Sequence, residues 1–451
     1  MPALSQRKLE IVRTLVDTAP DAVVEGLRQA LAAAGGDAAL ASVRQLVELE
    51  AGDRQLRNVS LAPLLPICVG DGADPLRLTF PARVPGLLWR ALKAQAPAFV
   101  RNAEVALYGG ETSADPYDRL LRIAAKGIRA AETREFQAVR QACDAARPAG
   151  AEALLAALDV APVVRRISLK LSGWVSHQTA EASAAARLAY KDAVAAAPDA
   201  GTIFFHMLAA QLPKPYTVLR IISAVMEKPT ERYLAESELG VFGEIVLRDV
   251  EQALAAVAGL DPDGGAEAAR AAAAQVNRVT GAGAELETYV TLSREQGWGK
   301  QLLKLRASLS ALVEERCDEA ETLFGQALPS SRGGAKRARR SDAQPDPVAV
   351  RRCLTLLAFV SELRASANPA GFAAARSRLF ETLGQELDLA VEHLVEAVKA
   401  GDAAAQAHLA VAADLSALVR DEKAGELVRR RAAAAAAPPP VDPVKSLLAG
   451  T

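Results

Sequence analysis

The chain has 451 residues, more than one ordinary hydrophobic core can organise, so two or three compact bodies are expected. Its formal net charge of −1 at pH 7 excludes a global electrostatic field that would attract nucleic acid or a membrane surface. Hydrophobic residues make up 51% of the chain and aromatic residues only 4%, because much of the apolar content is alanine. Alanine is the best helix former and buries little area per residue. We therefore predict an all-α protein held together by many shallow contacts.

The cysteines and the N-terminal segment indicate a cytoplasmic protein. The four cysteines are widely separated and form no C-x-x-C pair, which argues against a zinc knuckle or a dithiol motif: Cys68, Cys143, Cys317 and Cys353. Residues 1–16 carry charges in place of the apolar run of a secretory signal. No stretch approaches the roughly 20 apolar residues that span a bilayer. Arginine is much commoner than lysine, a bias associated with GC-rich bacterial genomes, so we expect a bacterial cytoplasmic protein without a transmembrane segment.

A unit of 16 residues recurs near the N-terminus, with Asp21, Asp37 and Asp53 at equivalent positions. This arrangement is typical of short helices in which an aspartate caps the start of each helix and a glycine, such as Gly52, ends the helix before it. The repeat spans residues 21–60 and does not continue, so an ordinary multi-helix bundle is the leading interpretation. An irregular α-solenoid-like body that begins with this pattern is the alternative.

Proline and glycine divide the next part of the chain into helical segments. We assign residues 1–150 to an N-terminal helical region and residues 151–328 to a central region continuous with it. The densest apolar stretch, residues 203–226, is expected to be central in the fold. We predict helices over residues 87–107, 117–131, 133–147, 151–158, 162–171, 181–197, 203–212, 216–226, 237–260, 266–280 and 284–327.

A flexible basic linker is expected at residues 329–347, where the composition changes to proline, serine and glycine. Its cations are candidates for binding a partner: Arg332, Lys336, Arg337, Arg339 and Arg340. Glycine and serine between them would let the segment follow a phosphate backbone or an acidic surface. Because no aromatic residue is interleaved for base stacking, a solubilising linker is the leading interpretation. Nucleic acid, an acidic protein and a lipid headgroup are the alternatives.

Residues 348–432 are predicted to form a small C-terminal helical bundle. Apolar residues lie along one strip of a helix that Gly401 ends, and Asp402 starts the next helix: Leu379, Leu383, Leu387, Leu394 and Val398. The strip is shorter than a coiled coil requires, so we expect an antiparallel bundle or a dimerisation hairpin.

The final segment, residues 433–451, is predicted to be a disordered tail rich in alanine and proline. Within it, three consecutive prolines precede Val444, Leu447 and Leu448. A disordered end without a partner is the leading interpretation, and the alternative is a short apolar motif that docks in a groove of a partner after a polyproline spacer.

Patterns that carry catalysis or bind a cofactor are missing from the sequence. The four histidines stand far apart, and none follows a glutamate by three positions, which excludes H-E-x-x-H and Glu-x-x-His metal sites: His177, His206, His393 and His408. The glycine-rich phosphate loops, the nucleophile elbow and paired aspartates for magnesium diphosphate are also missing. We expect no metal, no cofactor and no local catalytic residue, and we interpret His206 as a core residue.

The leading hypothesis for function is a non-enzymatic scaffold or adaptor that binds proteins through its helix faces or its C-terminal tail. Self-association through the C-terminal helices would make it a homo-oligomer. One alternative is a helical protein that encloses a small apolar ligand or a lipid, since residues 203–226 are unusually hydrophobic. The second is a nucleic-acid-associated protein that uses the basic linker, and nucleic acid is the least expected partner.

Overall fold

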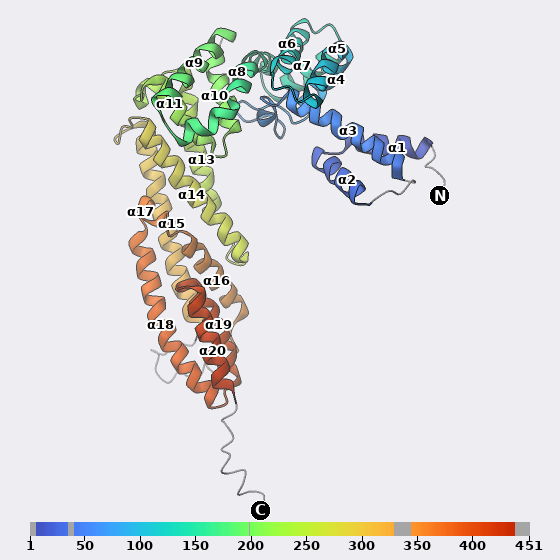
Figure 1. Cartoon of the computed structure of the whole chain (residues 1–451). Coiled ribbons are helices and arrows are strands. Elements are labelled where there is room, and N and C mark those ends of the chain that lie inside the picture. Colours follow the sequence, from blue (N-terminus) through green and yellow to red (C-terminus); the bar gives the residue numbers. More distant parts are fainter. Residues whose placement is uncertain (1–5, 35–39, 198, 329–343, 438–451) are drawn as a thin grey trace, which may run out of the picture. The chain divides into compact units, whose positions relative to one another are not determined.

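The computed structural model describes residues 6–34, 40–197, 199–328 and 344–437. Within these ranges the chain forms twenty α-helices, no β-strand, and isolated β-bridges such as that between Cys68 and Phe80 (Figure 1). The predicted all-α class is therefore confirmed. No helix in this part of the chain is long and apolar enough to cross a bilayer. The chain divides into two compact units, residues 1–242 and residues 243–451.

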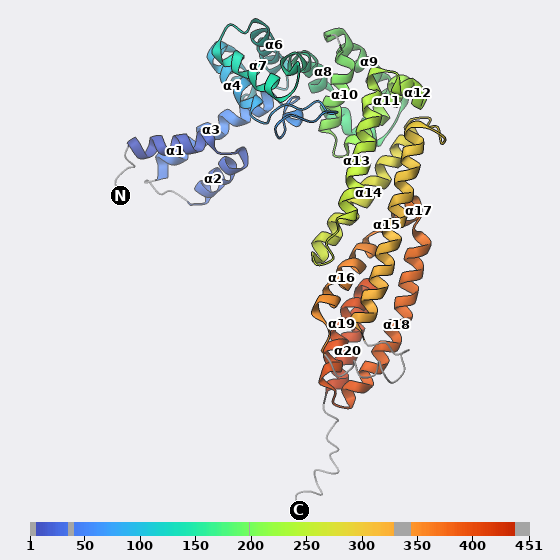
Figure 2. The same ribbon diagram turned by 180° about the vertical axis from the view of Figure 1, so that it is seen from behind.

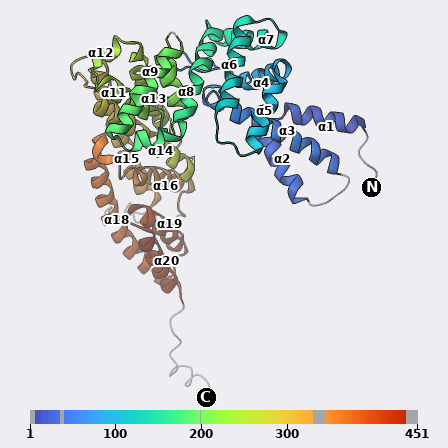
Figure 3. The same ribbon diagram turned by 45° about the horizontal axis from the view of Figure 1, so that its top comes forward.

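The first unit begins with three helices, α1 (Gln6–Thr18), α2 (Asp21–Ala33) and α3 (Ala41–Ser60), of which α1 and α2 both pack on α3 (Figure 3). Valine and leucine at helical spacing place one apolar face of each helix toward the others. Their shared core is small and aliphatic: Val16, Val24, Leu31, Val43 and Val47.

The 16-residue unit does not produce three short helices. Asp21 is the first residue of α2, but Asp53 lies in the middle of α3, and Asp37 is outside the described residues. Gly52 also lies inside α3, because burial of Leu56 on the same helix outweighs the cost of about 1 kcal/mol for an internal glycine. The Asp53 carboxylate accepts hydrogen bonds from two side chains of α4 (Val84–Gln95) instead of capping a helix: Trp89 Nε1 at 2.9 Å and Lys93 Nζ at 2.7 Å.

Nine further helices complete the first unit, and three of them differ from the sequence-based expectation. The predicted helix 87–107 is two helices, because Pro97 begins the second. The predicted helices 151–158 and 162–171 are one, since burial on both sides of Pro162 keeps the helix continuous despite the hydrogen bond that proline removes. The nine are α4 (Val84–Gln95), α5 (Pro97–Tyr108), α6 (Asp115–Ala130), α7 (Arg134–Ala146), α8 (Gly150–Ser176), α9 (Ala180–Ala196), α10 (Ala200–Gln211), α11 (Val218–Met226) and α12 (Glu231–Ala235).

Aromatic rings fill the core around α10. Phe204 and Phe205 are fully buried, and their ring centroids are 5.3 Å apart in an edge-to-face arrangement. Tyr190 of α9 stacks on Phe205 at 5.5 Å, and Phe242 meets Phe205 edge-on at 6.0 Å. Such geometries are the favoured ones for aromatic pairs. The central place predicted for the apolar stretch 203–226 is confirmed by this burial.

The second unit is built from long helices that lie side by side (Figures 1 and 2). In it α16 packs against α14, α15 and α19, while α18 packs against α15, α19 and α20. Its helices, the first of which starts two residues before the unit boundary, are α13 (Val241–Ala258), α14 (Gly265–Tyr289), α15 (Gly297–Ala327), α16 (Pro347–Glu362), α17 (Ala367–Ala370), α18 (Ala373–Lys399), α19 (Ala403–Val419) and α20 (Glu422–Ala436).

Glycine shapes the second unit in two places. The predicted break near residue 281 is wrong, because Gly283 lies inside α14, where a Cβ would come within 3.1 Å of the Leu302 Cδ1 atom of α15. Glycine there permits close helix packing and does not end the helix. Gly401, with a φ of +92°, ends α18 as predicted, and Asp402 Oδ1 accepts a hydrogen bond from the Ala404 amide at 2.8 Å to begin α19.

The division at residues 242 and 243 differs from the boundaries expected from sequence at 150 and at 329–347. Helix α16, which follows the predicted linker, packs on α14 and α15, which precede it. Independent folding of the segment 348–432 therefore stays a prediction. The predicted apolar strip of α18 is confirmed, since all five of its residues are buried. The tail begins later than residue 433, because the alanine run extends α20 to Ala436.

Candidate functional site

The sequence-predicted site residues lie outside the described part of the chain. Residues 329–343 contain all five linker cations: Arg332, Lys336, Arg337, Arg339 and Arg340. The tail residues Val444, Leu447 and Leu448 lie in the range 438–451, which is also outside it. Both assignments stay predictions, and the candidate sites must be sought among the other residues.

Among the described residues, no group of three or more histidines, cysteines and acidic residues is placed to hold a metal ion. The His206 ring contacts the Phe242 ring, with 4.7 Å between the centroids. Burial, followed by the charges of Arg147 and Arg77, lowers the pKa of His206 to about 4. His408 is buried, and its Nδ1 lies 2.9 Å from the Ala404 carbonyl oxygen. Both rings occupy packing positions.

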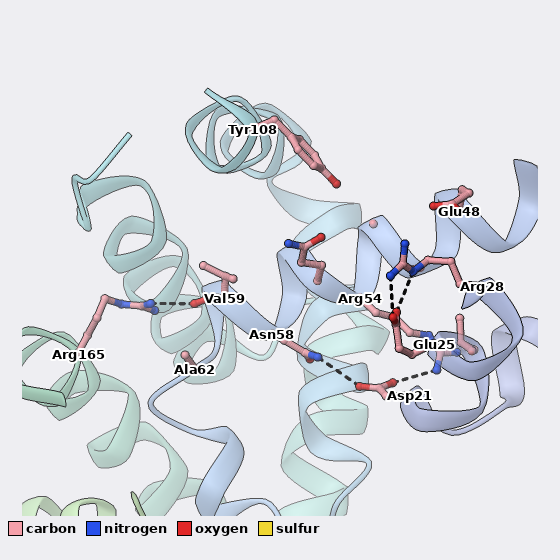
Figure 4. A pocket seen from close by; sticks show the side chains of 14 residues that line it. Asp21, Glu25, Arg28, Glu48, Arg54, Asn58, Val59, Ala62, Tyr108 and Arg165 are labelled. Atoms are coloured by element: carbon pink, nitrogen blue, oxygen red, sulfur yellow. Dashed lines mark hydrogen bonds and ion pairs between the residues drawn. The ribbon is translucent and has the colours of Figure 1, made fainter. Parts of the chain in front are cut away.

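A polar pocket of about 820 Å³ in the first unit is lined by residues of α2, α3, α5 and α8 (Figure 4). Tyr108 projects from α5 toward α3, where a Cβ at Gly52 would come within 2.9 Å of its hydroxyl oxygen. Three arginines face this pocket, and the partners of each decide whether the pocket can bind an anion.

Arg54 is engaged by the protein itself. Its side chain is 9% exposed, its Nη2 donates to the Val16 carbonyl at 2.8 Å, and its Nε donates to Glu50 at 2.6 Å. Its Nη1 donates to the Ala19 carbonyl at 2.7 Å and to Asp21 at 2.9 Å. The guanidinium thus caps the C-terminus of α1, whose last carbonyls have no partner within the helix.

The other two arginines are also paired. Arg165 Nε donates to Asp118 at 3.0 Å, and its Nη1 donates to the Val59 carbonyl at 2.8 Å, which caps α3. Burial raises the pKa of Asp118 and lowers that of Arg165, and their ion pair opposes both changes. Arg28 binds Glu25 through two hydrogen bonds, which helps lower the pKa of Glu25 to about 2. The three arginines of the pocket are therefore engaged in contacts that stabilise the fold, and none is left to bind an anion.

A second hollow, of about 780 Å³, is an apolar groove in the second unit, here named the α16–α19 groove. Helix α16 and helix α19 each contribute residues spaced by three or four positions, so that one stripe of each helix faces it. Most of these residues are half-buried. The stripe of α16 comprises Pro347, Val350, Arg351, Leu354, Thr355 and Ala358, and that of α19 comprises Ala407, Ala410, Val411, Asp414, Ala417 and Leu418.

The charged residues at the rim of the α16–α19 groove are paired with one another. Arg429 of α20 bonds to Asp414 at 2.9 Å and to Glu422 at 3.3 Å. Arg351 of α16 bonds to Asp263 at 2.9 Å, and hydrogen bonds from Arg352 and Arg351 lower the pKa of Asp263 to about 2. The rim is close to neutral, which leaves the apolar floor as the dominant chemical property of the groove.

Among the described residues, no element covers the floor of the groove completely. Helix α19 has only four polar residues: His408 and Ser416 are buried, and Gln406 and Asp414 lie with Ala410 on the exposed strip of the helix. A helix with so few polar residues is ordinarily buried over most of its surface. Yet Ala410 is exposed, and Val411 is only half-buried.

The groove was not predicted from the sequence, although a signal for it was present. Residues 403–419 contain only four polar side chains, which indicates a helix that other elements cover on most sides. How many neighbours the fold provides could not be read from the sequence. Comparison of the chain with protein-family models, with curated proteins and with solved structures finds no match.

Proposed function

We propose that this protein is a non-enzymatic helical scaffold that binds an amphipathic helix of a partner protein in the α16–α19 groove. The observation that carries the proposal is the apolar part of the groove floor on α19, which the described residues leave half-buried or exposed: Ala407, Ala410, Val411, Ala417 and Leu418. A partner helix laid against this face would complete the burial that the composition of α19 calls for.

The size of the groove supports a helix as the occupant. Its stripe on α19 runs from Ala407 to Leu418, which at about 1.5 Å per residue is about 17 Å, or three helical turns. Much of the floor consists of small side chains, since Ala407, Ala410 and Ala417 line it. Small residues let two helix backbones approach to about 8 Å, the short end of the range for packed helices.

The charges of the rim support a partner with an apolar stripe and no strong net charge. Asp414, Glu422 and Arg429 satisfy one another, so a charged partner would gain little and would have to compete with existing ion pairs. Binding should therefore depend on apolar contacts at positions i, i+3 or i+4, and i+7 of the partner helix. We expect its affinity to change little with ionic strength.

The cytoplasm of a bacterium is the proposed location. All four cysteines are buried and free, which is the usual state of thiols in a reducing compartment. The scaffold proposal needs no cofactor, and self-association of the second unit through the same groove is the competing use of this surface.

Affinity capture from a bacterial cell extract with matched variants tests the proposal. Ala410→Arg places a long charged side chain on the exposed floor of the groove, and arginine is a good helix former, so the fold should persist. Ala374→Arg makes the same change at an exposed position of α18 outside the groove and serves as control. We expect a protein captured by the original chain and by Ala374→Arg to be lost with Ala410→Arg.

The captured partner must then supply a helix that binds directly. A labelled peptide of that helix should bind the original chain in fluorescence anisotropy, with a Kd at least about tenfold higher for Ala410→Arg, a change of about 1.4 kcal/mol. A partner set that Ala410→Arg leaves unchanged would contradict the proposal. So would light scattering that shows a dimer broken by Ala410→Arg, because a second copy would then occupy the groove.

A further inference from the structure

We infer that the α16–α19 groove is occupied within the same chain by residues 441–448 of the tail, which compete there with a partner helix. This inference rests on the proposed function of the groove and names the element that regulates it. Residues 438–451 lie outside the described part of the chain, and the groove, the end of α20 and the sequence of the segment support the inference.

The end of α20 lies within reach of the groove. Glu422 and Arg429 of α20 line the groove, and the helix continues from Arg429 to Ala436. At about 1.5 Å per residue, the whole distance from Ala436 back to Glu422 is about 21 Å. The eight residues from Ala437 to Val444 span up to about 26 Å when extended. A chain that turns back at Ala437 can therefore place Val444 at any level of the groove along α20.

The sequence of the segment fits the mode of binding that the groove favours. Asp442 followed by Pro443 is a typical helix start, with an N-cap carboxylate and proline at the first helical position. Val444, Leu447 and Leu448 then fall at positions i, i+3 and i+4, which share one helix face. The sequence alone offered these three residues as a motif for a partner's groove, and the α16–α19 groove gives them a binding site in the same chain.

The charge and the length of residues 441–448 also fit the groove. Residues 441–448 carry one acidic and one basic side chain, Asp442 and Lys445, and so are neutral like the rim of the groove. Two helical turns of tail would occupy part of a floor about three turns long. A competing partner could thus bind first at the free end of the groove.

Tethering makes even a weak contact effective. A short covalent connection that spans the distance to the groove gives the tail an effective concentration of about 1 mM there. If the free segment bound with a Kd of about 0.1 mM, the tethered segment would occupy the groove about 90% of the time. A competing helix would then bind the original chain about tenfold more weakly than a chain whose tail cannot dock.

The test uses the full-length chain and a fluorescent peptide of residues 438–451. In one full-length variant, Leu447→Asp and Leu448→Asp remove the apolar face of the tail. We expect the peptide to bind this variant and to bind the original chain about tenfold more weakly in fluorescence anisotropy. Adding Ala410→Arg to the tail variant should abolish binding of the peptide, and adding Ala374→Arg should not. A peptide that carries the same two aspartates should not bind any of these chains.

Three results would overturn the inference. Equal affinity of the peptide for the original chain and the tail variant would show that the tail does not occupy the groove in cis. No binding to the tail variant would show that the segment does not fit. Dimers of the original chain that the tail variant lacks would show docking between copies. In each case a partner helix that still binds, and still loses affinity with Ala410→Arg, would leave the proposed function standing.

Discussion

Arg165 of α8 and Asp118 of α6 form an ion pair in the first unit, with 3.0 Å between the Nε and Oδ1 atoms. Both side chains are nearly buried, at 13% and 9% exposed. The same guanidinium also caps the carbonyl end of α3 through the Val59 oxygen. Removing one member of such a pair leaves a buried charge without its partner, which is far more costly than losing an exposed pair.

Arg165→Met should therefore lower the free energy of unfolding by about 3 kcal/mol. Arg166→Met is the control, because the neighbouring Arg166 pairs with Asp192 at the surface and should contribute less than about 0.5 kcal/mol. Urea denaturation followed by circular dichroism measures both changes. Equal destabilisation by the two substitutions would contradict the structural role given to Arg165.

His206 should make the stability of the protein sensitive to acid. Its pKa in the folded state is about 4, lowered by burial and by Arg147 and Arg77, while Asp74 acts in the opposite direction. In the unfolded chain the ring takes up a proton near pH 6.5. The unfolded state therefore binds more protons between these two values, and stability falls as the pH is lowered from 6.5 to 4.

The loss from His206 over this interval should be about 3 kcal/mol, from 1.36 kcal/mol for each pH unit. His206→Leu should flatten the dependence of the unfolding free energy on pH in this window, whatever its effect at neutral pH. NMR titration of the imidazole carbon-bound protons measures the pKa directly. A midpoint near 6.5 for His206 would refute the prediction.

Gly425 sets the contact between α19 and α20. A Cβ at this position would lie 2.8 Å from the Ala413 carbonyl oxygen and 3.0 Å from the Ala417 Cβ atom. Gly425→Ala should force the helices apart at a cost of about 1 to 2 kcal/mol, even after the gain in helix propensity.

Gly325 of α15 provides a control of opposite sign, because no atom lies within 4 Å of a Cβ placed there. Gly325→Ala should stabilise the protein by up to about 1 kcal/mol, since alanine is the better helix former. Thermal unfolding of the two variants side by side tests the pair. A rise in Tm for Gly425→Ala would show that α19 and α20 can separate without cost.

The thiols should be unreactive in the folded protein. Burial raises the pKa of Cys68, Cys143 and Cys353 to about 12 and that of Cys317 to about 11. The thiolate is the reactive species, so a disulfide reagent at pH 8 should label all four residues only as fast as the protein opens. When guanidinium chloride unfolds the protein, all four thiols should react at once, so that four equivalents of reagent are consumed per chain. Rapid labelling of any cysteine without denaturant would contradict its burial.

The helical fold was predictable because composition and local pattern agree along most of the chain. Alanine-rich segments with apolar residues at three- and four-residue spacing leave few alternatives to helix. Predictions of helix ends from single glycine or proline residues were wrong where burial of the neighbouring side chains keeps the helix continuous. Gly52, Pro162 and Gly283 all read as helix breakers, yet each lies inside a helix whose neighbours are buried.

The candidate groove could not be predicted, for a different physical reason. The apolar run of α19 indicates burial, but the exposure of Ala410 depends on the helices that pack around α19 and on the face that they leave open. Those contacts join segments far apart in sequence, such as α16 and α19. The polar pocket could not be predicted for the same reason, because its contacts also join distant residues. Arg54, for example, donates to the carbonyl of Val16, which lies 38 positions earlier in the chain.

The capping of α3 by Arg165 ties the completion of one helix to a residue 106 positions later in the chain, counted from Val59. During synthesis from the N-terminus, the last carbonyls of α3 must stay exposed to water until α8 has emerged and docked. A fragment that ends before residue 150 should therefore fray at the end of α3. The end of α3 is thus completed only after α8 has docked, although α1, α2 and α3 already share a core of their own.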